Sequence, residues 1–186
     1  MLLSRRDALT ERERMEMSRA ICARAVTMIG ARCEAGSVIA LYAHKGSEVE
    51  TTVLDEELRA AGYRIAYPRV VDEARVLAFH AVAIDELVAT RWGLREPTAA
   101  SSTVALEQIA AFVMPGLAFD RAGGRIGWGK GHYDATLAVA GVAGALRVGL
   151  AFECQLVDSV PREGHDVMLD AIITEVATHV VASGFE

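Results

Sequence analysis

The sequence predicts an α/β protein in which a mainly parallel sheet lies between helix layers. Short apolar runs of strand length alternate with helical segments along the chain, and polar or glycine-rich loops follow several of these runs. The composition suits such a fold, because 52% of the 186 residues are hydrophobic and can bury a sizeable core. The chain shows no internal repeat, low-complexity tract or clear linker, so we expect one domain over residues 1–186.

The chain opens with a helical segment at residues 3–30 that its pattern divides once. Thr10 and Glu13 form a capping-box pattern, so a second helix is predicted to begin at Thr10. The apolar run at 38–43 is predicted to be a buried parallel strand. The polar loop at 43–50 then lies at the carboxyl end of a strand, where ligands bind in open α/β sheets.

The rest of the chain continues this alternation. Thr52 and Asp55 are predicted to cap a helix that runs to about Ala61. The other predicted strands are residues 63–67 (ending at Pro68), 76–82, 109–114, 147–152, 169–174 and 176–181. Helical turns or helices are predicted at 84–88, 104–109 and 135–140, and loops at 91–103 and 161–166.

A glycine loop between the strand at 109–114 and the helix at 135–140 organises the chain. Alternating glycines let backbone N–H groups turn toward one point, and a helix N-terminus adds partial positive charge. Arg125 and Lys130 add full charges, so the loop is predicted to hold phosphate. It matches neither the P-loop nor the dinucleotide-binding turn. Three alternating glycines can also form a plain flexible turn, but the charged residues and Tyr133 packed among them favour phosphate binding.

Composition excludes several classes of protein. The net charge of −6 argues against a general nucleic-acid binder, so positive charge must be local. No apolar run approaches the length of a membrane span, and the N-terminus does not resemble a signal peptide. Three cysteines without C-x-x-C spacing fit a reducing compartment, so we expect a cytoplasmic protein without disulfides or a zinc site.

The glycine loop belongs to a longer signature. Residues 115–120 read Pro-Gly-Leu-Ala-Phe-Asp, and residues 125–134 read Arg-Ile-Gly-Trp-Gly-Lys-Gly-His-Tyr-Asp. This signature resembles that of the 5-formyltetrahydrofolate cyclo-ligases, also called 5,10-methenyltetrahydrofolate synthetases. Shorter segments agree in order along nearly the whole chain: 41–42, 48–51, 67–70, 95–97, 149–152 with Gln155, and 165–166 with 173–175. The resemblance implies a three-layer α/β/α fold, similar to the NagB/RpiA/CoA transferase-like architecture.

The resemblance also implies a reaction. It is the ATP- and Mg²⁺-dependent conversion of 5-formyltetrahydrofolate to 5,10-methenyltetrahydrofolate, with release of ADP and phosphate after phosphorylation of the formyl oxygen. The implied ATP-binding residues are Arg125, Ile126, Gly127, Trp128, Gly129, Lys130, Gly131, His132 and Tyr133. The implied substrate-binding residues are Ala43, Glu48, Trp128, Gly129, Lys130, Gly131 and His132.

Two carboxylates are implied as magnesium ligands. Asp134 closes the signature, and a carboxylate beside a phosphate loop suits Mg²⁺, although Asp134 can also be a plain helix-start charge. Asp166 matches the family's second magnesium carboxylate in a shorter motif. Trp128 and Tyr133 offer flat walls for a pterin ring. His132 stands where the signature usually has a second tyrosine, and it either hydrogen-bonds substrate or fills the site.

One departure from the family keeps an alternative open. Family members usually begin with a Lys and, four residues later, an Arg that grip ATP phosphates, and both positions fall before Met1. Arg5 and Arg6 lie further along the helix and do not match them. The alternative is therefore a folate- or nucleotide-binding homologue without turnover; the full signature argues against a phosphosugar isomerase-like enzyme. Expected partners are ATP and 5-formyltetrahydrofolate, with or without a polyglutamate tail, and we expect a monomer that binds neither nucleic acid nor membrane.

Overall fold

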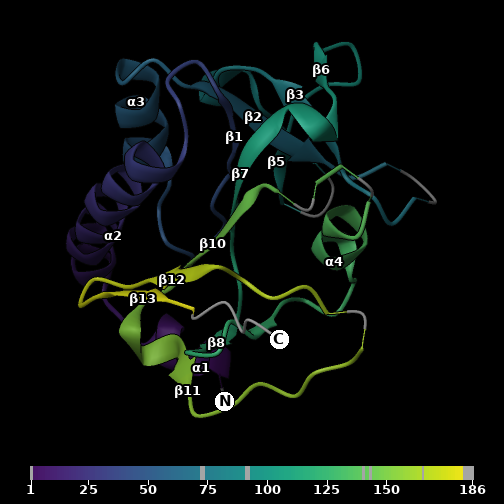
Figure 1. The fold of residues 1–186 in the computed structure, drawn as a ribbon. Helices are drawn as coiled ribbons and strands as arrows, with labels where there is room; N and C mark the ends of the chain where they lie inside the picture. Colours follow the sequence, from purple (N-terminus) through teal and green to yellow (C-terminus); the bar gives the residue numbers. More distant parts are fainter. Residues whose placement is uncertain are drawn as a thin grey trace.

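An eight-stranded sheet with the order β13-β12-β10-β7-β1-β2-β3-β6 forms the centre of the molecule (Figure 1). The computed structural model describes residues 2–71, 74–90, 93–139, 141–142, 144–164 and 166–181. The central strands pair in parallel: β1 (Val38–Ala40), β2 (Arg64–Arg69), β7 (Ile109–Met114), β10 (Leu146–Leu150) and β12 (Ala171–Ile173). The outer strands pair antiparallel: β3 (Ala78–Ala81), β6 (Thr103–Val104) and β13 (Thr178–Val180). The predicted mainly parallel sheet is confirmed.

The strand β7 shows why the apolar runs fold as they do. Its sequence is a continuous apolar run, and only Ala110 is not fully buried. β7 lies between β1 and β10, with a parallel neighbour on each side. A strand covered on both faces needs apolar residues at every position, which is the pattern that marks β7 in the sequence.

Three helices come from the first third of the chain: α1 (Leu2–Asp7), α2 (Glu11–Arg32) and α3 (Thr52–Ala60). The predicted capping box at Thr10 is confirmed, because the Thr10 hydroxyl accepts the Glu13 N–H and the Glu13 carboxylate accepts the Thr10 N–H. Within the described residues, no helix combines the length and apolar character that a membrane crossing requires.

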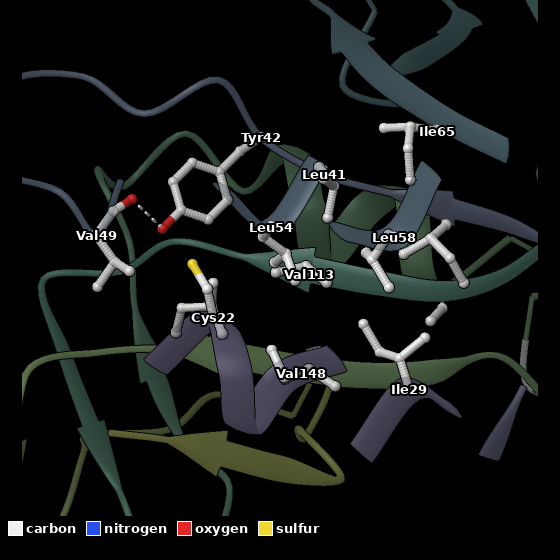
Figure 2. Packing of buried hydrophobic residues seen from close by; sticks show 14 of the residues in the cluster. Cys22, Ile29, Leu41, Tyr42, Val49, Leu54, Leu58, Ile65, Val113 and Val148 are labelled. Carbon is white, nitrogen blue, oxygen red and sulfur yellow. Dashed lines mark hydrogen bonds between the residues drawn. The ribbon is translucent and has the colours of Figure 1, made fainter. Parts of the chain in front are cut away.

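Helices cover both faces of the sheet. In Figure 1, α2 and α3 lie on one side and the short helix α4 (His132–Leu137) lies on the other. Figure 2 shows the first interface, where side chains of α2 and α3 meet those of the strands. Its labelled residues are Cys22, Ile29, Leu54 and Leu58 from the helices, Leu41, Ile65, Val113 and Val148 from the sheet and the segment after β1, and Tyr42 with Val49. The second core contains Leu137 of α4 and Phe112 of β7. The expected helix layers are confirmed.

Several predicted boundaries are wrong. The strand predicted at 38–43 ends at Ala40, and the predicted loop at 91–103 contains the short strand Arg95–Glu96. Three further differences have clear causes. The residue that precedes α3 is Thr51, not Thr52, and the Thr51 hydroxyl donates to the Tyr42 carbonyl at 2.7 Å instead of capping the helix. The helix after the glycine loop begins at His132, so Asp134 lies inside its first turn. β2 continues through Pro68 to Arg69, which is tolerated because β1 pairs only with residues 64–66.

A second, smaller sheet was not predicted. It contains β11 (Leu156–Val157), β8 (Ala118–Asp120) and β9 (Arg125–Ile126) in that order. β8 and β9 form the two arms of a hairpin that leads from β7 into the glycine loop. The remaining short elements are the hairpin β4 (Val88–Ala89) and β5 (Arg95–Glu96) and the 3-10 turns η1 (Ile84–Glu86), η2 (Leu106–Gln108) and η3 (Glu153–Gln155).

Candidate functional site

The strand order reverses between β1 and β7. From β1 the chain moves through β2 to β3 in one direction, and from β7 it moves through β10 to β12 in the other. The loops that leave β1 and β7 therefore diverge from the sheet at the same edge. In open α/β sheets this reversal is where ligands bind, outside the carboxyl ends of the strands. The loop after β1 carries Ala43 and Glu48, and the chain after β7 leads to the glycine loop.

The loop after β1 is held by hydrogen bonds to its own ends. The buried Tyr42 hydroxyl donates to the Val49 carbonyl at 3.0 Å (Figure 2), and Thr51 binds the Tyr42 carbonyl. The Lys45 N–H donates to the Glu48 carboxylate at 2.9 Å. Ala43 packs partly buried against the core. These contacts fix the position of Glu48 before any ligand arrives.

Glu48 is the carboxylate of the loop after β1 that reaches the glycine loop. Its burial raises its pKa, although the Lys45 N–H, the Arg6 guanidinium and a hydrogen bond from the Trp128 side chain act in the opposite direction. The same carboxylate raises the pKa of Tyr133, which burial raises most. The structure therefore brings Glu48, Trp128 and Tyr133 together from the two loops.

Arg6 is a site residue that sequence reasoning missed. Its side chain is buried, its Nε donates to the Ser47 hydroxyl at 2.9 Å, and its Nη1 donates to the Gly116 carbonyl at 3.3 Å. Arg6 of α1 therefore joins the loop after β1 to the loop after β7. No signal in the sequence marks it, because Arg5 beside it is the same residue type and α1 is too short to show a periodic face.

The glycine loop proper, residues 127–131, projects into solvent. Gly129 and Gly131 have φ of 77° and 64°, a left-handed conformation that glycine adopts without strain. Gly127 leaves room for Arg125, since a Cβ there would lie 2.9 Å from an Arg125 guanidinium nitrogen and would displace the end of that side chain. Lys130 is exposed, and Trp128 is 63% exposed, so both can meet a ligand.

Arg125 lies behind the loop and not on its open face. Its side chain is 7% exposed and pairs with the Asp134 carboxylate at 3.3 Å. It also donates to the Pro115 carbonyl at 3.5 Å, and its guanidinium lies 5.4 Å from the centre of the Tyr133 ring. The backbone of Ile126 helps to hold the entry of the loop, because its carbonyl accepts the Leu117 N–H at 2.7 Å.

The two carboxylates expected to hold Mg²⁺ come from adjacent segments. The Val167 N–H donates to Asp134 at 3.5 Å, which places the residue after Asp166 beside Asp134. The Asp166 carboxylate itself accepts the Glu163 N–H at 2.7 Å. No cluster of three or more metal-binding side chains occurs among the described residues, which do not include His165. A pair of carboxylates nevertheless fits Mg²⁺, which takes its other oxygens from phosphate and water.

Asp120 binds both the turn before β9 and the segment before Asp166. It is buried, and its carboxylate accepts the N–H groups of Ala122, Gly124 and Val160 and both contacts of the Arg162 guanidinium. These bonds fix the turn that leads into β9 and the segment that leads to Asp166. Nothing in the sequence pattern predicts this role.

Comparison with known proteins shows the family of this chain. The model of the 5-formyltetrahydrofolate cyclo-ligase family matches residues 1–175. The 5-formyltetrahydrofolate cyclo-ligase of Escherichia coli K12 is 30% identical over 94% of this chain and 96% of its own length. A 5,10-methenyltetrahydrofolate synthetase of Aquifex aeolicus is 26% identical and superposes with a TM-score of 0.79, covering 100% of this chain and 91% of the other.

A Mycoplasma pneumoniae 5,10-methenyltetrahydrofolate synthetase is 25% identical, with a TM-score of 0.74 and 94% of each chain covered. The fold, the signature and the family match therefore agree over nearly the whole described chain. The protein belongs to the 5-formyltetrahydrofolate cyclo-ligase family.

Proposed function

We propose that this protein catalyses the ATP-dependent conversion of 5-formyltetrahydrofolate to 5,10-methenyltetrahydrofolate, with ADP and phosphate as the other products. The observation that carries the proposal is the meeting of the Glu48 loop and the glycine loop at the reversal of strand order. The Glu48 carboxylate with the aromatic side chains of Trp128 and Tyr133 suits a pterin, and the glycine loop with Lys130 suits a triphosphate.

The chemistry divides into two balanced steps. The formyl oxygen attacks the γ-phosphorus of ATP, and the bond from that phosphorus to the β-γ bridging oxygen breaks to release ADP. The N-10 nitrogen then attacks the activated formyl carbon and loses its proton, and phosphate leaves with the bonding electrons of the C–O bond. Neither step needs a nucleophilic side chain, so the protein contributes positioning and charge.

The side chains divide this work. Glu48 would accept N–H groups of the pterin, and Trp128 and Tyr133 would cover its ring. Lys130 and the N–H groups of residues 127–131 would bind the phosphates and oppose charge that develops on the γ-phosphate. Asp134 and Asp166 would hold Mg²⁺, which neutralises phosphate charge when it is bound. Arg6 and Arg125 would hold the two loops in place from behind.

The decisive experiment measures phosphate release from ATP with and without 5-formyltetrahydrofolate, and follows formation of the methenyl product in the same sample. We expect phosphate and methenyl product in equal amounts. When 5-formyltetrahydrofolate is left out, we expect neither product to form. A variant that lacks the loop cation, Lys130→Ala, serves as the control that ties turnover to this site. Binding of both ligands with no product in the wild-type protein would establish the non-catalytic homologue instead.

A further inference from the structure

The glycine loop has little packing of its own. Residues 128–130 are exposed, and a Cβ added at Gly129 or Gly131 would meet no atom within 4 Å. The Trp128 side chain does bond to Glu48, but with few packing contacts along the loop its order depends strongly on the bonds at its two ends. Phosphate binding by backbone N–H groups requires those groups to be held in one arrangement before ATP arrives. The two ends of residues 127–131 therefore decide how well the loop is preorganised.

The two ends are fastened differently. At the entry, Arg125 pairs with Asp134, and the Ile126 carbonyl accepts the Leu117 N–H. At the exit, a His132 ring nitrogen, Nδ1, lies 2.9 Å from the Arg75 carbonyl oxygen. A carbonyl only accepts hydrogen bonds, so Nδ1 must carry the proton. Arg75 belongs to the segment that leads into β3, far from the loop in sequence.

A buried hydroxyl completes the exit fastening. The Thr136 Oγ1 accepts the Leu77 N–H at 2.9 Å and donates to the His132 carbonyl at 2.7 Å. Thr136 is buried. His132 is therefore bound twice: its backbone to Thr136, and its ring to the segment at 75–77. The hydrogen bond to Arg75 occupies the Nδ1 donor of His132, which leaves that atom unable to donate to a ligand.

We infer that His132 is a positioning residue, which fastens the exit of the phosphate-binding loop to the segment at 75–77 through its Nδ1–H. This inference rests on the proposed function, since it assigns the loop to ATP. It separates His132 from the residues that touch substrate. Loss of the Nδ1–H should loosen the exit of the loop and weaken ATP binding, while Trp128, nearer the entry, keeps its hydrogen bond to Glu48 and with it the folate side of the site.

Two substitutions distinguish the atoms of the ring. The side-chain amide of Asn places a donor near the position of Nδ1, whereas the longer Gln places its donor near Nε2. We expect His132→Gln to raise the KM for ATP about two- to fivefold. This is the lower part of the effect expected from losing one hydrogen bond, because the bond to the Arg75 carbonyl is exposed to water. His132→Asn should stay near wild type, and the KM for 5-formyltetrahydrofolate should change less than twofold in both. Equal effects of Asn and Gln, or a larger change in the folate KM, would overturn the inference.

A measurement without substrate tests the fastening itself. We expect the ¹⁵N resonances of the His132 ring to show the Nδ1–H tautomer at neutral pH. Amide hydrogen exchange at residues 129–131 should be faster in His132→Gln than in His132→Asn and wild type. Equal exchange rates in the three proteins would refute the positioning role. Because no turnover is involved, this result stands apart from the test of the proposed function.

Discussion

Replacing Asp120 by Asn should destabilise the protein strongly although it changes only one non-hydrogen atom. The Asp120 carboxylate receives hydrogen bonds from Ala122 and Gly124 on one oxygen, from Val160 on the other, and from Arg162 on both. Every partner is a donor. The amide of Asn carries two donors of its own, so in either orientation its NH₂ group faces donors and leaves a backbone N–H unpaired.

The magnitude follows from the burial of this carboxylate. A hydrogen bond to a charged group contributes roughly 1.5–3 kcal/mol, and a buried donor left unpaired costs about 1–3 kcal/mol. Arg162 is 40% exposed, so its ion pair adds little beyond this. We expect Asp120→Asn to lower the free energy of unfolding by about 2–4 kcal/mol at neutral pH. The exposed Asp158, two residues before Val160, gives a matched control whose change to Asn should stay within about 0.5 kcal/mol.

The pH dependence gives a second test of the same reasoning. Burial by itself would raise the pKa of Asp120, but the Val160 and Gly124 N–H groups and Arg162 outweigh it and lower the pKa. A carboxyl whose folded-state pKa is lowered stabilises the protein above its unfolded pKa of about 3.9, and this stability is lost as pH falls through the folded pKa.

Urea unfolding, followed by circular dichroism from pH 7 to pH 3, measures the difference between wild type and Asp120→Asn. The difference should be constant down to about pH 5 and shrink below about pH 4. A difference under about 0.5 kcal/mol at pH 7, or one that grows in acid, would show that Asp120 does not organise these segments.

Three further variants test the candidate site. Lys130→Ala should lower kcat/KM for ATP about ten- to a hundredfold with little effect on the folate KM, and steady-state kinetics that show only a folate effect would contradict its assignment. Glu48→Gln should raise the folate KM about ten- to a hundredfold. Because burial raises the pKa of Glu48, folding disfavours its charged form, so urea unfolding at pH 7 should find this variant at least as stable as wild type. Asp134→Asn should lower activity at least about tenfold and demand more Mg²⁺ in a titration; an unchanged magnesium dependence would remove Asp134 from the metal site.

The sequence was sufficient for elements whose signal is local. β7 has the predicted boundaries because its apolar run is unbroken, and α2 begins after Thr10 because the capping box lies within four residues. The positions of the Glu48 loop and the glycine loop also followed, since both come after buried strands.

The sequence contains no local signal for elements and residues whose position depends on partners far away in the chain. β8 and β11 pair in parallel over only two positions, and their partners lie far apart in the chain, so no local pattern marks that sheet. The role of Arg6 could not be predicted for the same reason, since its partners Ser47 and Gly116 belong to different loops. The sequence placed Arg125 in the phosphate loop by its charge, but its contacts with Asp134 and Pro115 follow from the β8–β9 hairpin, which was not predicted.

The distribution of charge suits the proposed ATP site in a chain with a net charge of −6. Arg6 and Arg125 are both largely buried. Each donates hydrogen bonds to protein oxygens, and these bonds fix the loops. The charge of Arg6 acts on the Glu48 carboxylate, and that of Arg125 is offset by Asp134. Lys130 and the loop N–H groups are exposed and can reach phosphate directly. We therefore expect the two arginines to set the shape of the site, and Lys130 and the backbone to contact the phosphates.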